Sequence, residues 1–360
     1  MHLKSIQLTG FKNHSEFSGR FSDKLNLITG PNGTGKTNIL DAIHFLCNTK
    51  SAFSSTDNTA IKHNQDFFRL EAHFEENNKN VKVECVCQQT EKKIFHVENK
   101  APDKLSEYIG RFPVVLITPY DTDVIREGSE LRRRFFDQII CQTNSEYLEK
   151  LMKYNRLIKQ RNALLKQFAE TNKVNKSLIS VYDEQIIPLI LYIGETRSIF
   201  NQRFLPHVIQ SYHVLAGEKE EIIVKYESVC NPETLEKDFL ANLHTDLIAQ
   251  RTTLGVHTDD YQFELKNTSV KKFGSQGQQK TFILALKIAH FKYILETKAI
   301  KPLLLLDDVF DRLDENRVNN LARLIDEGQF GQVFITDATP KRLTERFGNR
   351  TDELAIFKTS

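Results

Sequence analysis

The sequence predicts an α/β fold with mixed and antiparallel sheet, joined to a second lobe that is helical. Three observations predict it. A short apolar strand at 24–29 leads through a glycine-rich loop into an amphipathic helix at 38–46. Between 145 and 213, apolar residues recur at steps of three and four, which indicates helices. Continuous apolar runs typical of buried strands occur at 113–119, 303–306 and 332–336.

Length and composition indicate a globular protein of about two domains. The chain has 360 residues, of which 40% are hydrophobic and 27% charged. It contains no apolar run long enough to span a membrane and no signal-peptide pattern at its N-terminus. The five cysteines form no CxxC pair, so we expect packed thiols and a cytoplasmic location. Because the net charge is only +2, any DNA-binding surface must be a local patch.

The first hundred residues have the alternation of strands. A strand begins at Leu3, and further antiparallel strands are predicted at 67–74, 81–87 and 93–97. Near residue 121 the pattern changes. Two helical segments separated by the polar stretch 171–176 predict an antiparallel helical hairpin at about 145–213, with Pro188 kinking its second arm. Strand character then returns near 222–226, and helices are predicted at 232–250 and 281–291.

The glycine-rich loop, Gly30-Pro31-Asn32-Gly33-Thr34-Gly35-Lys36-Thr37, has the spacing of a phosphate-binding loop and is called the phosphate loop below. Its glycines let backbone N–H groups line an anion-sized hollow, and the following helix directs its positive end there. Lys36 can reach the β- and γ-phosphates, and the Thr37 hydroxyl can bind Mg²⁺. The alternative is an ordinary glycine-rich turn, which the flanking strand and helix disfavour. We therefore expect ATP and Mg²⁺ as cofactors.

Two carboxylates follow the buried run Leu303–Leu306. A triphosphatase needs one acid near its metal and one group that acts on water, and a stiff strand ending in acids supplies both. We assign Asp307 to Mg²⁺ and Asp308 to the attacking water, with loop acids after a core strand as the alternative. Most of the chain separates these acids from Lys36. We therefore expect a nucleotide lobe built from both chain ends, 1–120 and 250–360, and a helical lobe at 121–249.

A third motif, Phe-Gly-Ser-Gln-Gly-Gln-Gln-Lys at 273–280, precedes the 281–291 helix and is called the signature segment below. Ser, Gly and Gln at a helix start form an anion-binding surface of N–H groups and a hydroxyl. ATP-binding-cassette (ABC) ATPases use such a segment against the γ-phosphate held by a partner subunit. The alternative is a plain helix cap with a glycine before it.

These motifs together resemble the RecF family, bacterial recombination-mediator ATPases related to the heads of Rad50 and SMC proteins. The resemblance runs nearly from end to end. Besides the phosphate loop and Asn38, it covers residues 10–13, 132–137, 159–166, 251–260, 274–280 and 306–310.

The resemblance implies an ABC-type ATPase lobe and a homodimer that forms when ATP is bound. ATP would contact the following residues of its own subunit: Lys12, Gly30, Asn32, Gly33, Thr34, Gly35, Lys36, Thr37 and Asn38. The partner subunit would contribute the signature residues Ser275, Gly277 and Gln278. Lys36 and Asp308 would be catalytic, and Thr37 and Asp307 would hold the metal.

The resemblance also implies ATP-dependent binding of double-stranded and gapped DNA in DNA repair, replication and the response to DNA damage. With RecR and RecO, the family helps to load RecA on single strands. Its ATP hydrolysis is weak, DNA-stimulated and used as a switch, and the protein would be associated with the nucleoid.

The chain departs from the family's pattern at several positions. Residues 311–314, Asp-Arg-Leu-Asp, stand where the family often has Ser-Glu-Leu-Asp, and Thr258 replaces a basic residue. No histidine follows Ile335, so a transporter-type γ-phosphate switch is not expected. By position, residues 118–121 are the candidate Q-loop.

Seven basic residues and one acid lie between 150 and 173, with three arginines nearby at 132–134. We interpret this as a DNA phosphate-binding surface, with an ordinary solvated helical face as the alternative. Arg161 occupies an apolar seam position and is a candidate for pairing with Glu184 or Asp183. The candidate DNA contacts are Arg132, Arg133, Lys153, Arg156 and Lys159.

Two other functions fit parts of the pattern. A small-molecule kinase would use the phosphate loop but has no need of a signature segment. Another SMC-like, transporter-type or overcoming-lysogenization-type ATPase would act on a protein partner rather than on DNA.

Overall fold

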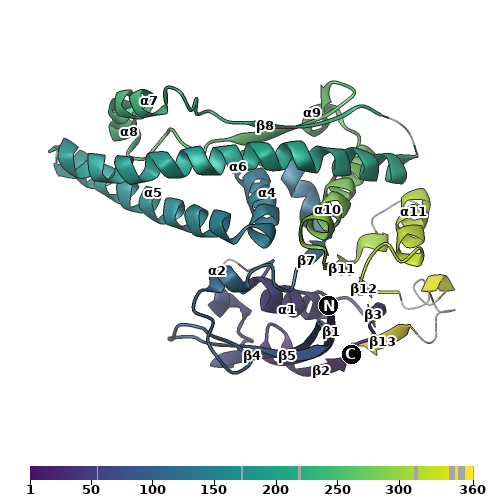
Figure 1. The fold of residues 1–360 in the computed structure, drawn as a ribbon. Helices are drawn as coiled ribbons and strands as arrows, with labels where there is room; N and C mark the ends of the chain where they lie inside the picture. Colours follow the sequence, from purple (N-terminus) through teal and green to yellow (C-terminus); the bar gives the residue numbers. More distant parts are fainter. Residues whose placement is uncertain are drawn as a thin grey trace. The chain divides into compact units, whose positions relative to one another are not determined.

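The computed structural model describes residues 1–54, 56–171, 173–217, 220–311, 315–339, 345–347 and 353–359. The side chains of residues 311–314, which depart from the family's pattern, lie outside this description. The chain forms two compact units. Unit 1 comprises Met1–Thr122, Gln210–Glu218 and Lys280–Ser360, and unit 2 comprises Asp123–Ile209 and Lys219–Gln279. Figure 1 shows the elements of both units along the chain.

The antiparallel sheet of unit 1 has the order β2-β1-β4-β5-β6. Adjacent strands in it are antiparallel throughout, as the alternating sequence predicts. Inward-facing residues such as Leu70 and Cys85 are buried, and their neighbours along the strand are more exposed. The strands are β1 (His2–Phe11), β2 (His14–Arg20), β4 (Phe67–Glu76), β5 (Lys79–Gln88) and β6 (Ile94–Val97).

The second sheet of unit 1 is parallel and has the order β13-β3-β12-β11-β7. Apart from β13, the strands of this sheet are buried at every residue, which explains their largely apolar sequences. The carboxyl ends of parallel strands share one sheet edge, where ligands of α/β folds bind. The strands are β3 (Leu25–Thr29), β7 (Val114–Ile117), β11 (Leu303–Asp307), β12 (Val333–Asp337) and β13 (Leu354–Lys358).

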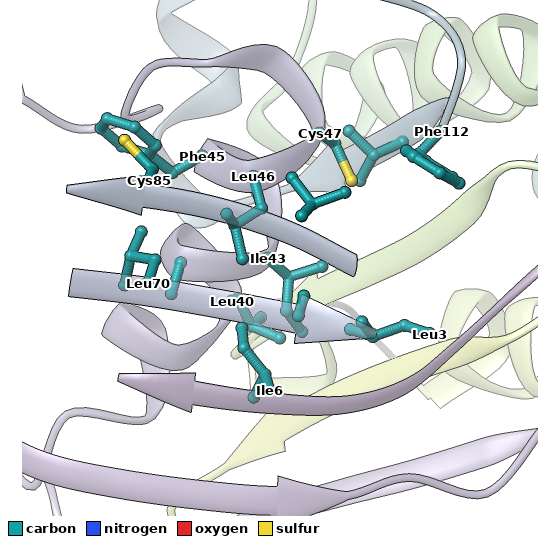
Figure 2. Packing of buried hydrophobic residues seen from close by; sticks show 14 of the residues in the cluster. Leu3, Ile6, Leu40, Ile43, Phe45, Leu46, Cys47, Leu70, Cys85 and Phe112 are labelled. Atoms are coloured by element: carbon teal, nitrogen blue, oxygen red, sulfur yellow. The ribbon is translucent and has the colours of Figure 1, made fainter. Parts of the chain in front are cut away.

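Helix α1 (Lys36–Asn48) contacts strands of both sheets and carries much of the core of unit 1. In Figure 2, Leu40 and Ile43 of α1 point towards the strands that carry Ile6 and Leu70. Burial of each aliphatic side chain of this kind stabilises the fold by roughly 1.5–3 kcal/mol. The position of α1, and with it the end of the phosphate loop, is therefore held by the main hydrophobic cluster of unit 1.

The remaining elements of unit 1 are short apart from two helices. Helix α10 (Gln276–Lys298) begins in unit 2 and continues into unit 1, and α11 (Glu315–Asp326) follows β11. The short elements are η1 (Asp57–Ala60), α2 (Leu105–Tyr108), η2 (Pro119–Thr122) and η3 (Val309–Asp311).

Unit 2 contains the expected helical hairpin, formed by α5 (Ser145–Thr171) and α6 (Lys176–Ala216). Figure 1 shows the two helices side by side, and Phe168 of α5 packs in one cluster with Ile179 of α6. Pro188 lies inside α6, as does Pro206. The predicted 232–250 helix is two short helices, which meet at Asn242: α7 (Leu235–Ala241) and α8 (Leu243–Ala249).

A small antiparallel sheet, in the order β10-β9-β8, completes unit 2. Its strands are β8 (Ile222–Glu227), β9 (Asp260–Leu265) and β10 (Thr268–Ser269). The short helix α3 (Asp123–Arg126) precedes α4 (Ser129–Thr143), and α9 (Val270–Phe273) precedes the signature segment.

The unit boundaries differ from the expected lobes in two places. Residues 250–279 belong to unit 2 because β9 pairs with β8 and Thr252 bonds to Asn162 of α5. Residues 210–218, the end of α6, belong to unit 1, where Tyr212 packs against Phe282. Among the described residues, no helix combines the length and apolar character that crossing a membrane requires.

Candidate nucleotide site

The phosphate loop joins β3 to α1 at the carboxyl edge of the parallel sheet. Gly30, Gly33 and Gly35 have φ of 154°, 85° and 95°, which favour glycine over other residues. A Cβ at Gly35 would lie 2.4 Å from Asn13 Oδ1, whereas a Cβ at Gly33 would meet no atom within 4 Å. Gly35 is also the N-cap of α1 and has no side chain to occupy the helix end. The space beside Gly33, two residues before the N-cap of α1, is therefore open.

Lys36 is buried and lies across its own loop. Its Nζ donates to Gly30 O at 2.8 Å and to Pro31 O at 3.0 Å. Backbone carbonyls satisfy an ammonium group less well than a phosphate anion does. The arrangement therefore keeps the charge at the loop with partners that an anionic ligand can replace.

Thr37 and Asp307 meet directly. Thr37 Oγ1 donates to Asp307 Oδ1 at 2.8 Å, and Thr336 Oγ1 donates to the same oxygen at 2.9 Å. Asp307 is 3% exposed, and burial raises the pKa of its carboxyl group although both hydroxyls oppose the shift. A hydroxyl and a carboxylate oxygen at one point are hard ligands of the kind Mg²⁺ prefers.

Asp308 lies at the turn that follows β11. Its φ of 47° is uncommon for a residue other than glycine. The Asp308 N–H donates to Thr336 Oγ1 at 3.0 Å, which holds this conformation. Thr336 of β12 therefore orients both acids, a role that the sequence did not suggest.

The turn between β1 and β2 rests on the phosphate loop. Asn13 Nδ2 donates to Gly33 O at 3.1 Å, and His14 Nε2 lies 3.0 Å from Gly35 O. Asn38 Nδ2, on the first turn of α1, donates to Asn13 Oδ1 at 2.6 Å. The predicted residue Asn38 thus holds the turn, while Asn13 and His14 are contacts that no local sequence pattern indicated.

Lys12, at the same turn, has a φ of 53° and forms an ion pair with a buried acid. Its Nζ lies 2.7 Å from Asp41 Oδ2, and the Asp41 carboxylate also accepts from Ser51 Oγ and Ala52 N, both at 2.7 Å. Asp41 is fully buried on α1. The resemblance implies that Lys12 lies near the phosphates; in the structure its ammonium is paired with Asp41, and it is the neighbouring Asn13 that contacts the phosphate loop.

The signature segment caps α10. Gln278 N donates to Ser275 Oγ at 3.2 Å, and Ser275 N donates to Gln278 Oε1 at 2.9 Å. This reciprocal pair is a capping box, so the plain-cap interpretation describes part of what the segment does. Because the Ser275 hydroxyl accepts from the backbone, it can still donate its own proton to another acceptor. Gly277 lies between the two residues on the same turn.

Among the candidate DNA contacts, Lys153, Arg156 and Lys159 are exposed at a three-residue spacing along α5. No salt bridge to these three residues occurs among the described residues. Arg132 is a correction: it is buried, and its Nε and Nη2 bind Asp260 at 2.7 and 2.9 Å. It is therefore committed to unit 2 and is not a DNA contact. Arg133 donates to Asp259 O and is partly committed as well.

Arg161 is structural, and the expected pairing with Asp183 is confirmed. Its Nε lies 2.7 Å from Asp183 Oδ1, while its Nη1 lies 2.6 Å from Asp246 Oδ2 and 2.8 Å from Thr252 Oγ1. Asn162 Oδ1 accepts from the N–H and the hydroxyl of Thr252 at 2.7 and 2.8 Å. Arg161 and Asn162 thus join the hairpin to the 251–259 loop.

A second buried arginine, Arg197 of α6, performs a similar task. It binds Asp137 at 2.9 Å and Asp259 at 3.1 Å, and its Nη1 donates to Val256 O at 2.6 Å. Residues 251–260, one of the segments that resemble the RecF family, thus contact both helices of the hairpin in unit 2.

Comparison with solved structures defines the class of the fold. The chain matches an SMC head domain from Pyrococcus yayanosii with a TM-score of 0.56 at 14% identity, covering 96% of this chain and 93% of that one. It matches the recombination mediator protein RecF bound to ATP with a TM-score of 0.87 at 26% identity, covering 94% and 92%. The ABC-type fold of SMC and RecF heads, which the resemblance implied, is confirmed.

Sequence comparison gives the family. Residues 2–354 match the model of the RecF/RecN/SMC N terminal domain. The DNA replication and repair protein RecF of Cytophaga hutchinsonii is 42% identical over 357 residues, which cover 99% of this chain and 94% of the relative. The RecF protein of Flavobacterium johnsoniae is 41% identical, with 95% of each chain covered. The chain therefore belongs to the RecF family.

Proposed function

We propose that the protein is an ATP-dependent DNA-binding switch of DNA replication and repair. The observation that carries the proposal is the contact of Thr37 with Asp307, which brings the phosphate loop and the acid-ended strand to one point. The ATP-bound RecF structure, related over nearly the whole chain, supports ATP as the nucleotide.

The residues at this point fit Mg·ATP. The space beside Gly33 is open, and Thr37 and Asp307 offer oxygen ligands for Mg²⁺. Bound Mg²⁺ would neutralise charge on the phosphates. Lys36 would exchange the carbonyls of Gly30 and Pro31 for the β- and γ-phosphates, since its ammonium is already at the loop. Asp308 would orient and deprotonate the attacking water.

The site is completed by a second copy of the chain in this proposal. Ser275 and Gly277 would contact the γ-phosphate of the partner's nucleotide, supported by their position at the N-terminus of α10 and by the donor capacity of the Ser275 hydroxyl. Gln278 would act indirectly, because its side chain holds the backbone of Ser275. ATP would thus favour the dimer, and its slow hydrolysis would release it.

DNA would bind through phosphate contacts to the exposed stripe Lys153, Arg156 and Lys159, so that affinity depends on salt more than on sequence. We propose double-stranded and gapped DNA as ligands. We also propose that the protein is cytoplasmic and associated with the nucleoid. Cooperation with RecR and RecO in loading RecA is proposed from the RecFOR pathway to which the ATP-bound relative is assigned.

The test is a titration of the ATPase rate against duplex, single-stranded and gapped DNA over a range of salt. The proposal predicts a low basal rate that duplex or gapped DNA raises, with stimulation lost as salt increases. A rate that no DNA changes, in a chain that still hydrolyses ATP, would favour a protein partner. Phosphate transfer to a small molecule instead of water would favour a kinase.

A further inference from the structure

The C-terminal strand of unit 1 ends on the phosphate loop. Strand β13 runs parallel to β3, and Lys358 lies opposite Thr29, the last residue of β3. The N–H of the next residue, Thr359, donates to Thr29 O at 2.8 Å. This register brings Thr359 to Gly30, where the phosphate loop begins.

The fit between Thr359 and Gly30 is close. Gly30 has a φ of 154°, and a Cβ on it would lie 2.4 Å from both the carbonyl oxygen and Oγ1 of Thr359. Only glycine allows the two backbones to approach in this way. Thr359 is therefore packed against Gly30 of the loop. Because the two residues are far apart in the sequence, no local motif predicts this contact.

A chain of hydroxyl groups continues from Thr359 across the loop. Thr359 Oγ1 lies 2.5 Å from Thr34 Oγ1, and Thr34 Oγ1 donates to Pro31 O at 2.9 Å. A hydroxyl has one proton, so the proton shared by the two threonines comes from Thr359. The other contact of that hydroxyl, to Thr29 O at 3.4 Å, is long and competes weakly.

The end of this chain, Pro31 O, also accepts from Lys36 Nζ at 3.0 Å. Lys36 has to leave this carbonyl in order to reach a triphosphate. Thr34 is then the donor to Pro31 O that remains among the described contacts, and Thr359 fixes the direction in which Thr34 donates.

We propose that Thr359 is a positioning residue for the nucleotide: its hydroxyl holds Thr34 on the Pro31 carbonyl, so that the phosphate loop keeps its shape when Lys36 turns to a nucleoside triphosphate. The inference rests on the proposed function of the loop. It assigns to the far end of the chain a part in nucleotide affinity and none in the chemical step.

The variants Thr359→Ala and Thr359→Ser test the hydroxyl, because serine keeps it and alanine does not. Thr34→Ala and the double variant Thr34→Ala/Thr359→Ala complete a double-mutant cycle. The measurements are the affinity for a fluorescent ATP analogue with Mg²⁺, turnover at saturating ATP, and thermal unfolding as a control of folding. Each uses the full chain.

We expect Thr359→Ala to weaken ATP binding by roughly three- to tenfold, the effect of one hydrogen bond, with turnover at saturation unchanged. Thr359→Ser should bind within about twofold of the parent chain, given that it keeps the hydroxyl. The double variant should bind no more weakly than Thr34→Ala alone, because both changes remove the same chain of hydrogen bonds.

Three results would overturn the inference. Thr359→Ala could bind ATP as the parent chain does, the Ala and Ser variants could be equally weak, or the two single effects could multiply in the double variant. If Thr359→Ala does not fold, Thr359→Ser and Thr34→Ala still decide. A parent chain that binds no ATP would contradict the proposed function instead.

Discussion

Lys12 Nζ and Asp41 Oδ2 lie 2.7 Å apart, and Asp41 is fully buried on the helix that follows the phosphate loop. The ion pair joins the turn between β1 and β2 to α1 at its second turn. Since Asn13 of that turn contacts Gly33, the pair also holds one wall of the phosphate loop.

Asp41→Asn should weaken ATP binding several-fold, because the Lys12 ammonium loses its charged partner while the carboxamide keeps one acceptor for Ala52. A binding titration with a fluorescent ATP analogue measures this. Ser51→Ala is the matched control, since it removes another donor to the same carboxylate without touching Lys12. If the losses of ATP affinity in Asp41→Asn and Lys12→Ala add in the double variant, Lys12 and Asp41 do not act as a pair.

Asp308→Asn should lower ATP turnover by at least roughly 100-fold, the usual contribution of a positioned general base, and should leave ATP binding within a few-fold. Single-turnover hydrolysis and a binding titration separate the two effects. Lys36→Ala provides the contrast, because it should lose binding itself. Normal turnover in Asp308→Asn would remove Asp308 from the mechanism.

Arg161→Ala should destabilise unit 2 by about 3–5 kcal/mol, because Asp183 and Asp246 would remain buried without a cation. Urea unfolding followed by circular dichroism measures the loss. Lys159→Ala, two positions away on the exposed face of the same helix, should change stability by less than about 0.5 kcal/mol. Similar unfolding of the two variants would show that the buried network contributes little.

Replacing Lys153, Arg156 and Lys159 by glutamine should weaken duplex DNA binding and flatten its salt dependence. Each lost phosphate contact lowers the slope of log affinity against log salt by about 0.9. Fluorescence anisotropy at several salt concentrations gives the slope. Lys237→Gln, an exposed lysine on α7 of the same unit, is the control and should leave the slope unchanged. An unaltered slope in the triple variant would exclude this stripe as the DNA contact.

Unit 1 should lose stability as the pH falls below about 6.5. Burial lowers the pKa of His44 to about 4, and it lowers the pKa of His290 well below 6.5. Both rings are neutral in the fold and take up protons on unfolding, so their contribution is present above 6.5 and is lost between 6.5 and the folded pKa. His290→Gln should reduce the pH slope of the unfolding free energy by at most about 1.4 kcal/mol per pH unit. A slope identical to that of the parent chain would place His290 outside this effect.

Much of the fold follows from local patterns. The phosphate loop, its strand and its helix are contiguous, so spacing and periodicity predict them together. The buried strand before Asp307 is predictable because its residues are apolar without interruption. By contrast, β9 pairs with β8 from far along the chain, and no local pattern predicts which strand it pairs with.

The site was predictable where a motif carries the chemistry and not where contacts form between distant segments. Thr37 and Asp307 could be assigned from their motifs, whereas Thr336, Asn13 and Thr359 act through neighbours far away in sequence. Charge alone also misled: Arg132 and Lys153 look alike in the sequence, but Arg132 is buried and paired with the half-buried Asp260, whereas Lys153 is exposed. Burial, which the sequence does not state, separates a structural arginine from a candidate DNA contact.

The most direct measurement is the molar mass of the chain in solution, by sedimentation, with Mg·ATP, with Mg·ADP and without nucleotide. A site that needs the signature segment of a second copy predicts a dimer with Mg·ATP and a monomer in the other two states. Ser275→Arg should remain monomeric with Mg·ATP while still binding the nucleotide. The same mass in all three nucleotide states would contradict the account.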